Sequence, residues 1–434
     1  MPPRHPLVAA LGLALAACAP AACAFELGYS LETALGHSDN VGQSAIDPVS
    51  QSMLIPRLDF TFSEDGAYLR ANAVGQIEYR DYLGGAFDNE VRGQLTSQAV
   101  WMILPYRLSM DFEDYAAVQP VNVLASNAPN NQQQTNVFTA GPTFNFHLFQ
   151  TLDGEADLRA TNSTASVTHE FDSNRTLGAL RAIRKLSALD ALSANVEAQH
   201  VHFTDASGGP DYDRYDAYAR YQSKLASLDL DLAAGWSRID FSKLVPSHSG
   251  VFTRDTLAWH ASASNTFSIG YLRQFTDASQ DIAYDSTTLS SIAPGGAVLA
   301  GSTPVTSEVY RENRVDGSWE YQDARFHVRA APYYRTFHYL IDPTLDQKAH
   351  GATAGVSYRM RPLWTLAFDA LEETRRYSFL ARRDEDLRFD LSFTDQLTRQ
   401  WSVRLDLIRN ERNSSAADQG FRENVVFLTL IFRR

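Results

Sequence analysis

The residues of this sequence that are best suited to chemistry are charged side chains that recur at every second position. In an extended strand, side chains two residues apart point to the same side, so such runs form one charged face. Carboxylates and guanidinium groups on one face hydrogen-bond to hydroxyl-rich or ionic solutes. The alternative is that they only pair across strands and set the register of a sheet. We expect the following residues to line a water-filled interior: Arg70, Glu78, Arg80, Asp229, Asp231, Arg325, Arg329, Arg335, Asp386, Arg388, Asp390, Arg404 and Asp406.

Hydrolytic or metal-dependent chemistry finds little support in the sequence. The histidines lie on distant segments, and no Gly-x-Ser-x-Gly motif accompanies them. His200 and His202 are two residues apart and offer a weak metal pair at most, so an ordinary pair at a strand end is the simpler interpretation. Asp205, Asp211 and Asp213 could offer oxygens to Ca²⁺, although loops of this kind are more often simply solvated. We therefore predict that the chain is not an enzyme and holds no cofactor or metal.

Charge and cysteine usage narrow the class of protein. The 434 residues carry a formal net charge of −13, which argues against nucleic acid as a partner because phosphate binding needs clustered Lys and Arg. The two cysteines, Cys18 and Cys23, both lie near the amino terminus. The rest of the chain therefore needs neither disulfides nor a thiolate metal site.

The amino-terminal segment is typical of an export signal. Arg4 gives it a basic start, Leu7–Ala17 is apolar, and Ala22–Ala24 is a small-x-small cleavage site. The apolar run is too short to cross a bilayer as a helix. We predict a signal peptide that ends at Ala24, followed by the mature fold over residues 25–434. The alternative is that Leu15–Cys18 acts as a lipobox whose cysteine is acylated.

Two-residue alternation of apolar and polar side chains recurs along the rest of the chain and predicts strands with two unlike faces. Leu228, Leu230 and Leu232, for example, alternate with Asp229 and Asp231. No run after the leader reaches 18 consecutive apolar residues, so no transmembrane helix is expected. Many apolar faces end in an aromatic residue, as in the interfacial girdle of a membrane barrel. The tryptophans in such positions are Trp101, Trp236, Trp259, Trp319, Trp364 and Trp401.

The connections between the alternating segments tend to be short and long by turns. Short ones such as Pro105–Arg107 and Arg361–Leu363 alternate with longer polar ones such as Gly36–Ser50 and Gln119–Gln133. Short periplasmic turns and long outer loops produce this rhythm in bacterial outer-membrane barrels, and a soluble sandwich has no reason to. The pattern predicts an all-β, up-and-down antiparallel transmembrane barrel in the outer membrane of a Gram-negative bacterium. We count about 20 strands, with 18 as the alternative because Val167–Leu186 is hard to divide.

The longest connection, Ala278–Thr303, differs in composition from the other loops. Its second half, Ile292–Gly301, is apolar and uncharged, and a mobile apolar segment is poorly stabilised in water. Long structureless loops are usually functional, and folding one inward would narrow a wide barrel. The alternative is a loop tip that rests on lipopolysaccharide or on a neighbouring loop. We predict a constriction at the outer opening that includes Ile292, Pro294, Gly295, Gly296 and Leu299.

Several segments resemble one family, the outer-membrane β-barrels of porin type that are encoded with exopolysaccharide and PEP-CTERM/exosortase systems. The resembling segments are Ser38–Asn40, Glu78–Leu83, Phe87–Val91, Pro129–Asn131, Asn136–Pro142, Pro210–Arg214 and Arg422–Asn424. The resemblance spans nearly the whole mature chain and implies a role in the export of a secreted polysaccharide. The family has no agreed catalytic residues, so none are assigned here.

These observations lead to one expectation for function and two alternatives. We expect a polar lumen that passes or guides an exopolysaccharide outward. The partners would be outer-membrane lipid and lipopolysaccharide, the polymer itself and periplasmic polysaccharide export proteins. One alternative is a general diffusion porin for small hydrophilic solutes. The other is a plugged barrel with a structural or adhesive role at the cell surface.

Overall fold

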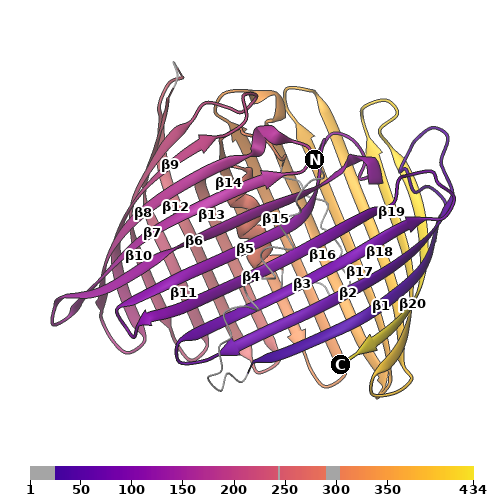
Figure 1. The fold of residues 1–434 in the computed structure, drawn as a ribbon, viewed down its shortest axis with the longest axis horizontal. Coiled ribbons are helices and arrows are strands. Elements are labelled where there is room, and N and C mark those ends of the chain that lie inside the picture. Colours follow the sequence, from indigo (N-terminus) through magenta and orange to yellow (C-terminus); the bar gives the residue numbers. More distant parts are fainter. Residues whose placement is uncertain (1–24, 243–244, 290–303) are drawn as a thin grey trace.

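The chain folds into one closed barrel of antiparallel strands (Figure 1). The computed structural model describes residues 25–242, 245–289 and 304–434. All 20 strands form one sheet, and β1 pairs with both β2 and β20, which closes the sheet on itself. The predicted fold class and the count of about 20 strands are therefore confirmed. The leader falls outside the described residues, so the signal peptide and its lipobox alternative stay predictions.

The first ten strands are β1 (Glu26–Ser38), β2 (Gln51–Asp65), β3 (Leu69–Tyr82), β4 (Glu90–Leu104), β5 (Leu108–Pro120), β6 (Gln132–Phe149), β7 (Leu152–Ala165), β8 (Ser173–Lys185), β9 (Asp190–Phe203) and β10 (Tyr212–Lys224). The second ten are β11 (Leu228–Phe241), β12 (His248–Ser262), β13 (Asn265–Thr276), β14 (Tyr310–Gln322), β15 (Phe326–Tyr339), β16 (Gln347–Arg361), β17 (Trp364–Tyr377), β18 (Arg382–Gln396), β19 (Trp401–Ser414) and β20 (Phe421–Arg433). The helical segments are η1 (Pro129–Asn131), η2 (His169–Phe171), α2 (Ala278–Leu289) and η3 (Pro343–Leu345).

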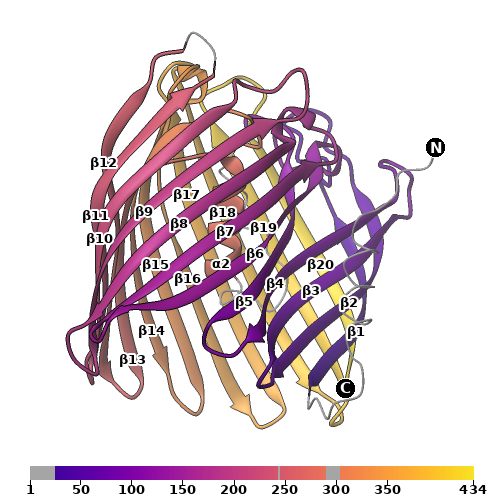
Figure 2. The ribbon, with the colours of Figure 1, turned by 60° about the vertical axis from the view of Figure 1, so that its left-hand side comes forward.

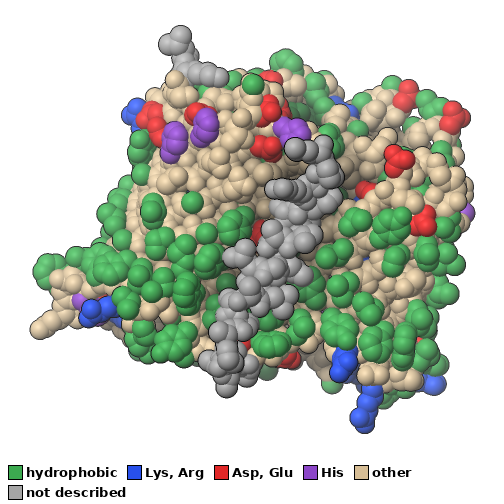
Figure 3. Space-filling model, viewed as in Figure 1, with side chains coloured by type: hydrophobic (Ala, Val, Ile, Leu, Met, Phe, Trp, Pro, Cys, Tyr) green, Lys and Arg blue, Asp and Glu red, His purple; other side chains and the backbone are tan. Residues whose placement is uncertain are grey.

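The outer face of the barrel is apolar and exposed, the reverse of a water-soluble domain. On β1, Leu27, Leu31 and Leu35 are 53%, 51% and 55% exposed, while Glu32 on the opposite face is 6% exposed. Apolar side chains cover much of the outer wall in Figure 3. An apolar exterior around a charged interior fits lipid outside and water inside.

Aromatic side chains form a belt at one end of the barrel. Trp259, Phe267 and Trp319, on three neighbouring strands, have ring centroids 5.5 and 6.4 Å apart. The tryptophans that lie at this end are Trp101, Trp259, Trp319, Trp364 and Trp401, whereas Trp236 lies nearer the other end. Such belts mark the boundary between hydrocarbon and water.

The two ends of the barrel carry different connections. At the end with the aromatic belt, which we call the short-turn rim, the strands are joined by turns of two to four residues. At the other end, the long-loop rim, the connections run from four residues up to the segment between β13 and β14. The carboxyl terminus lies at the short-turn rim (Figure 1). In bacterial barrels the short turns face the periplasm, so we expect the short-turn rim there.

The connection between β13 and β14 was expected to be a long outer loop without secondary structure of its own, and for its first half, which the structure describes, this was wrong. Ala278–Leu289 is a helix, α2, which lies inside the barrel (Figure 2). Ala278 is fully buried and Ile282 is 4% exposed. The helix forms because the side chain of Asp277 accepts a hydrogen bond from the Gln280 N–H (3.1 Å), which caps its first turn. Among the described residues, no helix is long and apolar enough to cross a membrane.

Candidate functional site: the polar lumen

Charged pairs line the inner wall of β15 to β19. Arg329 pairs with Asp369 at 2.8 Å, and this contact passes over the intervening strand β16. Gly355 of β16 makes the contact possible, because a Cβ there would lie 2.5 Å from Asp369 Oδ1 and 2.8 Å from Arg329 Nε. The Arg335–Glu373 pair (2.9 Å) crosses the same strand. Small residues on β16 thus allow charged side chains of β15 and β17 to contact each other above that strand.

A second group of charges surrounds a cavity of about 440 Å³ on the wall formed by β5 to β8. Thr143 donates to Asp111 or Asp157, whose oxygens lie 2.6 and 2.7 Å from its hydroxyl. Arg159 contacts both of these carboxylates, and Arg181 pairs with Asp157 and Glu155. The lining residues are Ser109, Asp111, Glu113, Thr143, Glu155, Asp157, Arg159, Leu177 and Arg181. Convergent donors and acceptors around one apolar side chain suit a hydrophilic ligand.

The start of α2 is fixed by a buried cluster around Asp277. The carboxylate of Asp277 pairs with Arg175 of β8 at 2.6 Å and accepts a hydrogen bond from the hydroxyl of Tyr212 at 2.5 Å. Burial alone would raise the pKa of this carboxyl. The Arg175 guanidinium and the hydrogen bonds from Tyr212 and Gln280 more than offset that effect, so the pKa of Asp277 lies below its usual value.

Further contacts hold α2 against the wall. Ser279 is hydrogen-bonded to Ser163 of β7 at 2.7 Å, and Tyr310 at the start of β14 donates to Asp281. Ile282 packs into a buried apolar cluster with Tyr115 of β5 and Phe171 of η2. The helix α2 is therefore fixed to the inner wall in the half of the barrel next to the long-loop rim.

The tip of the β5–β6 hairpin also leaves the wall. β4 pairs with β5 only up to Ala116, while β5 and β6 stay paired to Pro120. Gln134 of β6 bridges the gap by donating to the carbonyl oxygens of Gly93 (2.7 Å) and Ala117 (2.9 Å).

Two arginines on distant strands hold this tip in place. Arg382 of β18 donates to the carbonyl oxygen of Leu124 (2.6 Å), and Arg412 of β19 donates to that of Ala125 (2.7 Å). The Ser126 hydroxyl donates to the carbonyl oxygen of Gly42, in the connection between β1 and β2, at 3.5 Å. The tip thus joins parts of the long-loop rim that no strand pairing connects.

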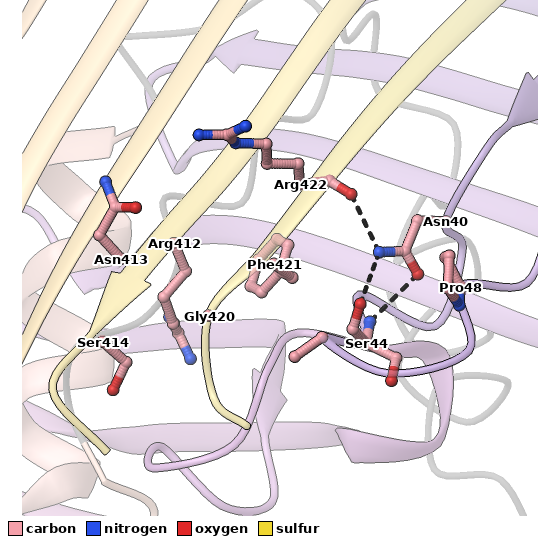
Figure 4. Close-up of a pocket in the computed structure, with 10 residues that line it drawn as sticks. Asn40, Ser44, Pro48, Arg412, Asn413, Ser414, Gly420, Phe421 and Arg422 are labelled. Atoms are coloured by element: carbon pink, nitrogen blue, oxygen red, sulfur yellow. Dashed lines mark hydrogen bonds between the residues drawn. The ribbon is translucent and has the colours of Figure 1, made fainter. Parts of the chain in front are cut away.

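Beside this tip lies an open cavity of about 470 Å³ at the long-loop rim (Figure 4). Asn40 and Ser44 form one side of the cavity. The Asn40 side chain is hydrogen-bonded to the Ser44 backbone and donates to the carbonyl oxygen of Arg422. The Arg412 guanidinium lies 5.7 Å from the ring centre of Phe421 on the other side. The cavity combines polar groups with one aromatic ring at the lumen mouth.

Alternation places the predicted lining residues on the inner face, with one exception. Arg325 lies in the turn before β15 and is exposed at the short-turn rim, because the strand begins only at Phe326. On the strand walls, the contacts that these residues form with carboxylate, arginine or histidine side chains include Arg70–Asp65, Glu78–Arg80, Asp229–His260, Asp231–Arg220, Arg329–Asp369, Arg335–Glu373, Asp386–Arg375, Asp386–Arg412, Arg388–Asp390, Arg404–Glu32 and Arg404–Asp406. Their contact with a solute stays a prediction.

Several of these pairs lie within one strand, as in Arg388–Asp390 (3.5 Å) and Arg404–Asp406 (3.0 Å). A pair within one strand cannot fix the register between two strands. Arg404 also lies 3.7 Å from Glu32 of β1, and Arg388 donates to Asn410 of β19 at 3.3 Å, so the alternative that these charges set register stays open.

The histidines and loop aspartates do not form a shared site in the described part of the chain. His200 pairs with Asp213 and His202 with Asp211, each at 2.8 Å. Asp205 instead accepts hydrogen bonds from Ser207. No group of three or more His, Cys, Asp or Glu residues within the described ranges is arranged to hold a metal ion. The predicted constriction residues Ile292, Pro294, Gly295, Gly296 and Leu299 lie outside the described residues.

Two parts of the site were not predicted from the sequence. The β5–β8 cavity had a signal, because Asp153, Glu155, Asp157 and Arg159 alternate on one face of β7. No sequence pattern indicates the cluster that anchors α2, because Arg175, Tyr212 and Asp277 are far apart in the sequence and come together only in the folded barrel.

Comparisons with known proteins assign the chain to no family. No family model matches the chain, and no curated protein sequence matches it. Among solved structures, the chain is similar to the FrpB iron transporter from Neisseria meningitidis (10% identity, TM-score 0.43, covering 94% of this chain and 82% of that one). It is also similar to OccK2 (OpdF) from Pseudomonas aeruginosa (9% identity, TM-score 0.39, 94% and 98% covered) and to the copper transporter OprC (10% identity, TM-score 0.45, 94% and 80% covered).

The classification therefore rests on the chain's own architecture. A closed antiparallel barrel with an apolar exterior, a charged interior and an aromatic belt is an integral outer-membrane β-barrel. The predicted location in the outer membrane is thereby confirmed.

Proposed function

We propose that this barrel conveys a hydrophilic polymer, an exopolysaccharide, through or alongside its lumen to the cell surface. The observation that carries the proposal is the cavity of about 440 Å³ on the β5–β8 wall. Its carboxylates, guanidinium groups and Thr143 hydroxyl offer many donors and acceptors to sugar hydroxyls, and Leu177 offers an apolar contact for the face of a sugar ring. The resemblance to barrels of exopolysaccharide systems supports the choice of polymer.

The test is deletion of the gene, followed by complementation with variants. We expect deletion to reduce surface polysaccharide and to retain polymer or its precursors in the periplasm. Wild-type protein should restore export. The Asp157→Asn/Arg159→Gln double variant, which changes the cavity, should restore it less well than Arg238→Gln, whose side chain is exposed outside the lumen. Unchanged surface polymer after deletion would overturn the proposal.

A general diffusion porin is the second candidate, and α2 favours it. An ordered helix inside the barrel is suited to sieving small solutes. Swelling of proteoliposomes in sugars of increasing size would test it. A size cut-off, together with lost uptake and unchanged polymer in the deletion strain, would favour the porin over the polymer conduit.

A further inference from the structure

The cations of this barrel are distributed unevenly along its axis. In the lumen, most arginines pair with carboxylates, as in Arg335–Glu373 and Arg404–Asp406. At the short-turn rim, Arg70 and Lys185 pair with Asp65 and Asp153, and nine further exposed cations form no ion pair with any described residue. These are Arg107, Arg184, Lys224, Arg325, Arg359, Arg361, Arg399, Arg433 and Arg434. They come from turns and strand ends around the whole circumference.

Several of these cations have the same orientation in their strands as the lumen charges. Lys224 is four residues beyond Arg220 on one face of β10, and Arg359 is four residues beyond Gly355 on the inner face of β16. Arg433 likewise shares the inner face of β20 with the buried Thr429. The alternation of strands therefore aims these side chains at the rim of the opening rather than at the lipid.

The long-loop rim carries many carboxylates beside exposed cations such as Lys348 and Arg376. Carboxylates there that form no ion pair with a described residue include Asp39, Asp47, Asp81, Asp88, Glu170, Asp205, Glu308, Asp342 and Asp418. Burial raises the pKa of Glu308, and the negative charges of Asp342 and Glu170 add to this effect. On the face shown in Figure 3, most acidic side chains lie toward the upper edge and most basic ones toward the lower edge.

We propose that the polymer handled by this barrel is polyanionic, such as a polysaccharide with uronate groups, and that it meets the barrel at the short-turn rim. The inference rests on the proposed function and narrows its substrate class. Unpaired cations attract a polyanion to this opening and raise its local concentration. In the lumen, most arginines are already paired with carboxylates, so they bind a polyanion only weakly. The carboxylates of the long-loop rim repel the polyanion and favour its release.

The test measures binding, so it does not depend on an open pore. Full-length protein in nanodiscs of neutral phosphatidylcholine is titrated against a fluorescent hexamer of mannuronate, with fluorescent maltohexaose as the neutral probe. We expect the uronate to bind and the maltohexaose to bind much more weakly, with the difference reduced in high salt because the charges are exposed.

Charge reversal locates the binding. The Arg107→Glu/Lys224→Glu/Arg359→Glu variant should lose at least about tenfold in uronate affinity. The matched control, Lys348→Glu/Arg376→Glu, reverses exposed cations at the long-loop rim and should retain it. If the triple reversal impairs folding, Gln at the same positions serves instead.

Equal affinity for the two probes, or an equal loss in both sets of variants, would overturn the inference. So would a triple variant that keeps its uronate affinity but no longer binds phosphatidylglycerol vesicles, because the rim would then serve anionic lipid. The deletion strain tests the proposed function separately. If that strain fails to export polymer but one of these binding results is obtained, the proposed export function is retained and only the inference that the polymer is a polyanion is rejected.

Discussion

The charge of a single residue, Asp277, helps to fix the position of the helix α2 inside the barrel. Its carboxylate caps α2 through Gln280 and pairs with Arg175, and both ion-pair side chains are almost completely buried. Removing one member of a buried pair leaves the other charge uncompensated and costs about 3–5 kcal/mol. The position of α2 is therefore sensitive to the charge of one side chain.

The first prediction concerns pH. The pKa of Asp277 in the folded protein lies below its ordinary value of 3.8, so the ionised carboxylate stabilises the fold above that value. This contribution is lost as the pH falls through the lower, folded pKa. A nitroxide on Ile282→Cys should stay immobile from pH 7 to about pH 4 and become mobile at lower pH.

The control is the same label in Asp277→Asn, which lacks the titrating group. We expect a mobile label at every pH in that variant. A label that is still immobile there would show that other contacts, such as Ser279–Ser163, hold the helix without Asp277.

At the scale of elements, the strands were predictable and the inward-folded parts were not. Alternation is a local signal, and each face meets either lipid or water along its whole length, so the pattern of Leu228–Trp236 is enough to identify a strand. The helix α2 has a local start signal in Asp277 and Gln280, but a polar helix among loop residues gives no clear period. Its partners on β7, β8 and β10 become neighbours only when the barrel closes.

The β5–β6 tip could not be predicted for a different reason. It is held by the carbonyl oxygens of Leu124 and Ala125, and backbone acceptors are the same for every residue type. Arg382 and Arg412 likewise resemble the other arginines of the inner wall. They reach the tip only because β5 stops pairing with β4 at Ala116, and no sequence pattern indicates where that pairing ends.

The second prediction tests this attachment. Gly42→Cys and Ser126→Cys should form a disulfide, since Ser126 Oγ lies 3.5 Å from the Gly42 carbonyl oxygen and a Cβ on Gly42 meets only an ordinary contact with Phe87. Arg382→Ala should lower the yield of the cross-link, measured on a gel, because the tip loses a hydrogen bond. Arg409→Ala, an exposed arginine of the neighbouring strand, should not change it. An equal yield in all three proteins would show that the arginine does not hold the tip.

The third prediction concerns α2 as a constriction. Replacing residues 278–304 with a short Gly/Ser link should raise the single-channel conductance in planar bilayers, because an ordered obstacle leaves the lumen. Sensitivity of cells to bulky antibiotics should rise with it. Assembly is checked by heat-modifiable migration on a gel. A properly assembled variant with wild-type conductance would show that α2 does not narrow the path for ions.

At the scale of the whole molecule, the two rims differ in loop length, aromatic content and charge. The belt of Trp259, Phe267 and Trp319 lies next to the short turns, and the unpaired cations lie at the same rim. The carboxylates gather where the loops are long. Three independent properties thus distinguish the same two ends, which gives the barrel a definite direction in the membrane.

The fourth prediction is that the short-turn rim faces the periplasm. Single cysteines at Ser207 in the connection between β9 and β10 and at Asp418 between β19 and β20 should react with a membrane-impermeant maleimide on intact cells, since both positions are exposed at the long-loop rim. Cysteines at Gly66 and Leu363, in short turns, should react only after the outer membrane is permeabilised. Leader cleavage after Ala24 would leave no native cysteine to interfere. Labelling in the reverse order would invert the barrel, place the unpaired cations at the cell surface, and remove the basis for a polyanion that arrives from the periplasm.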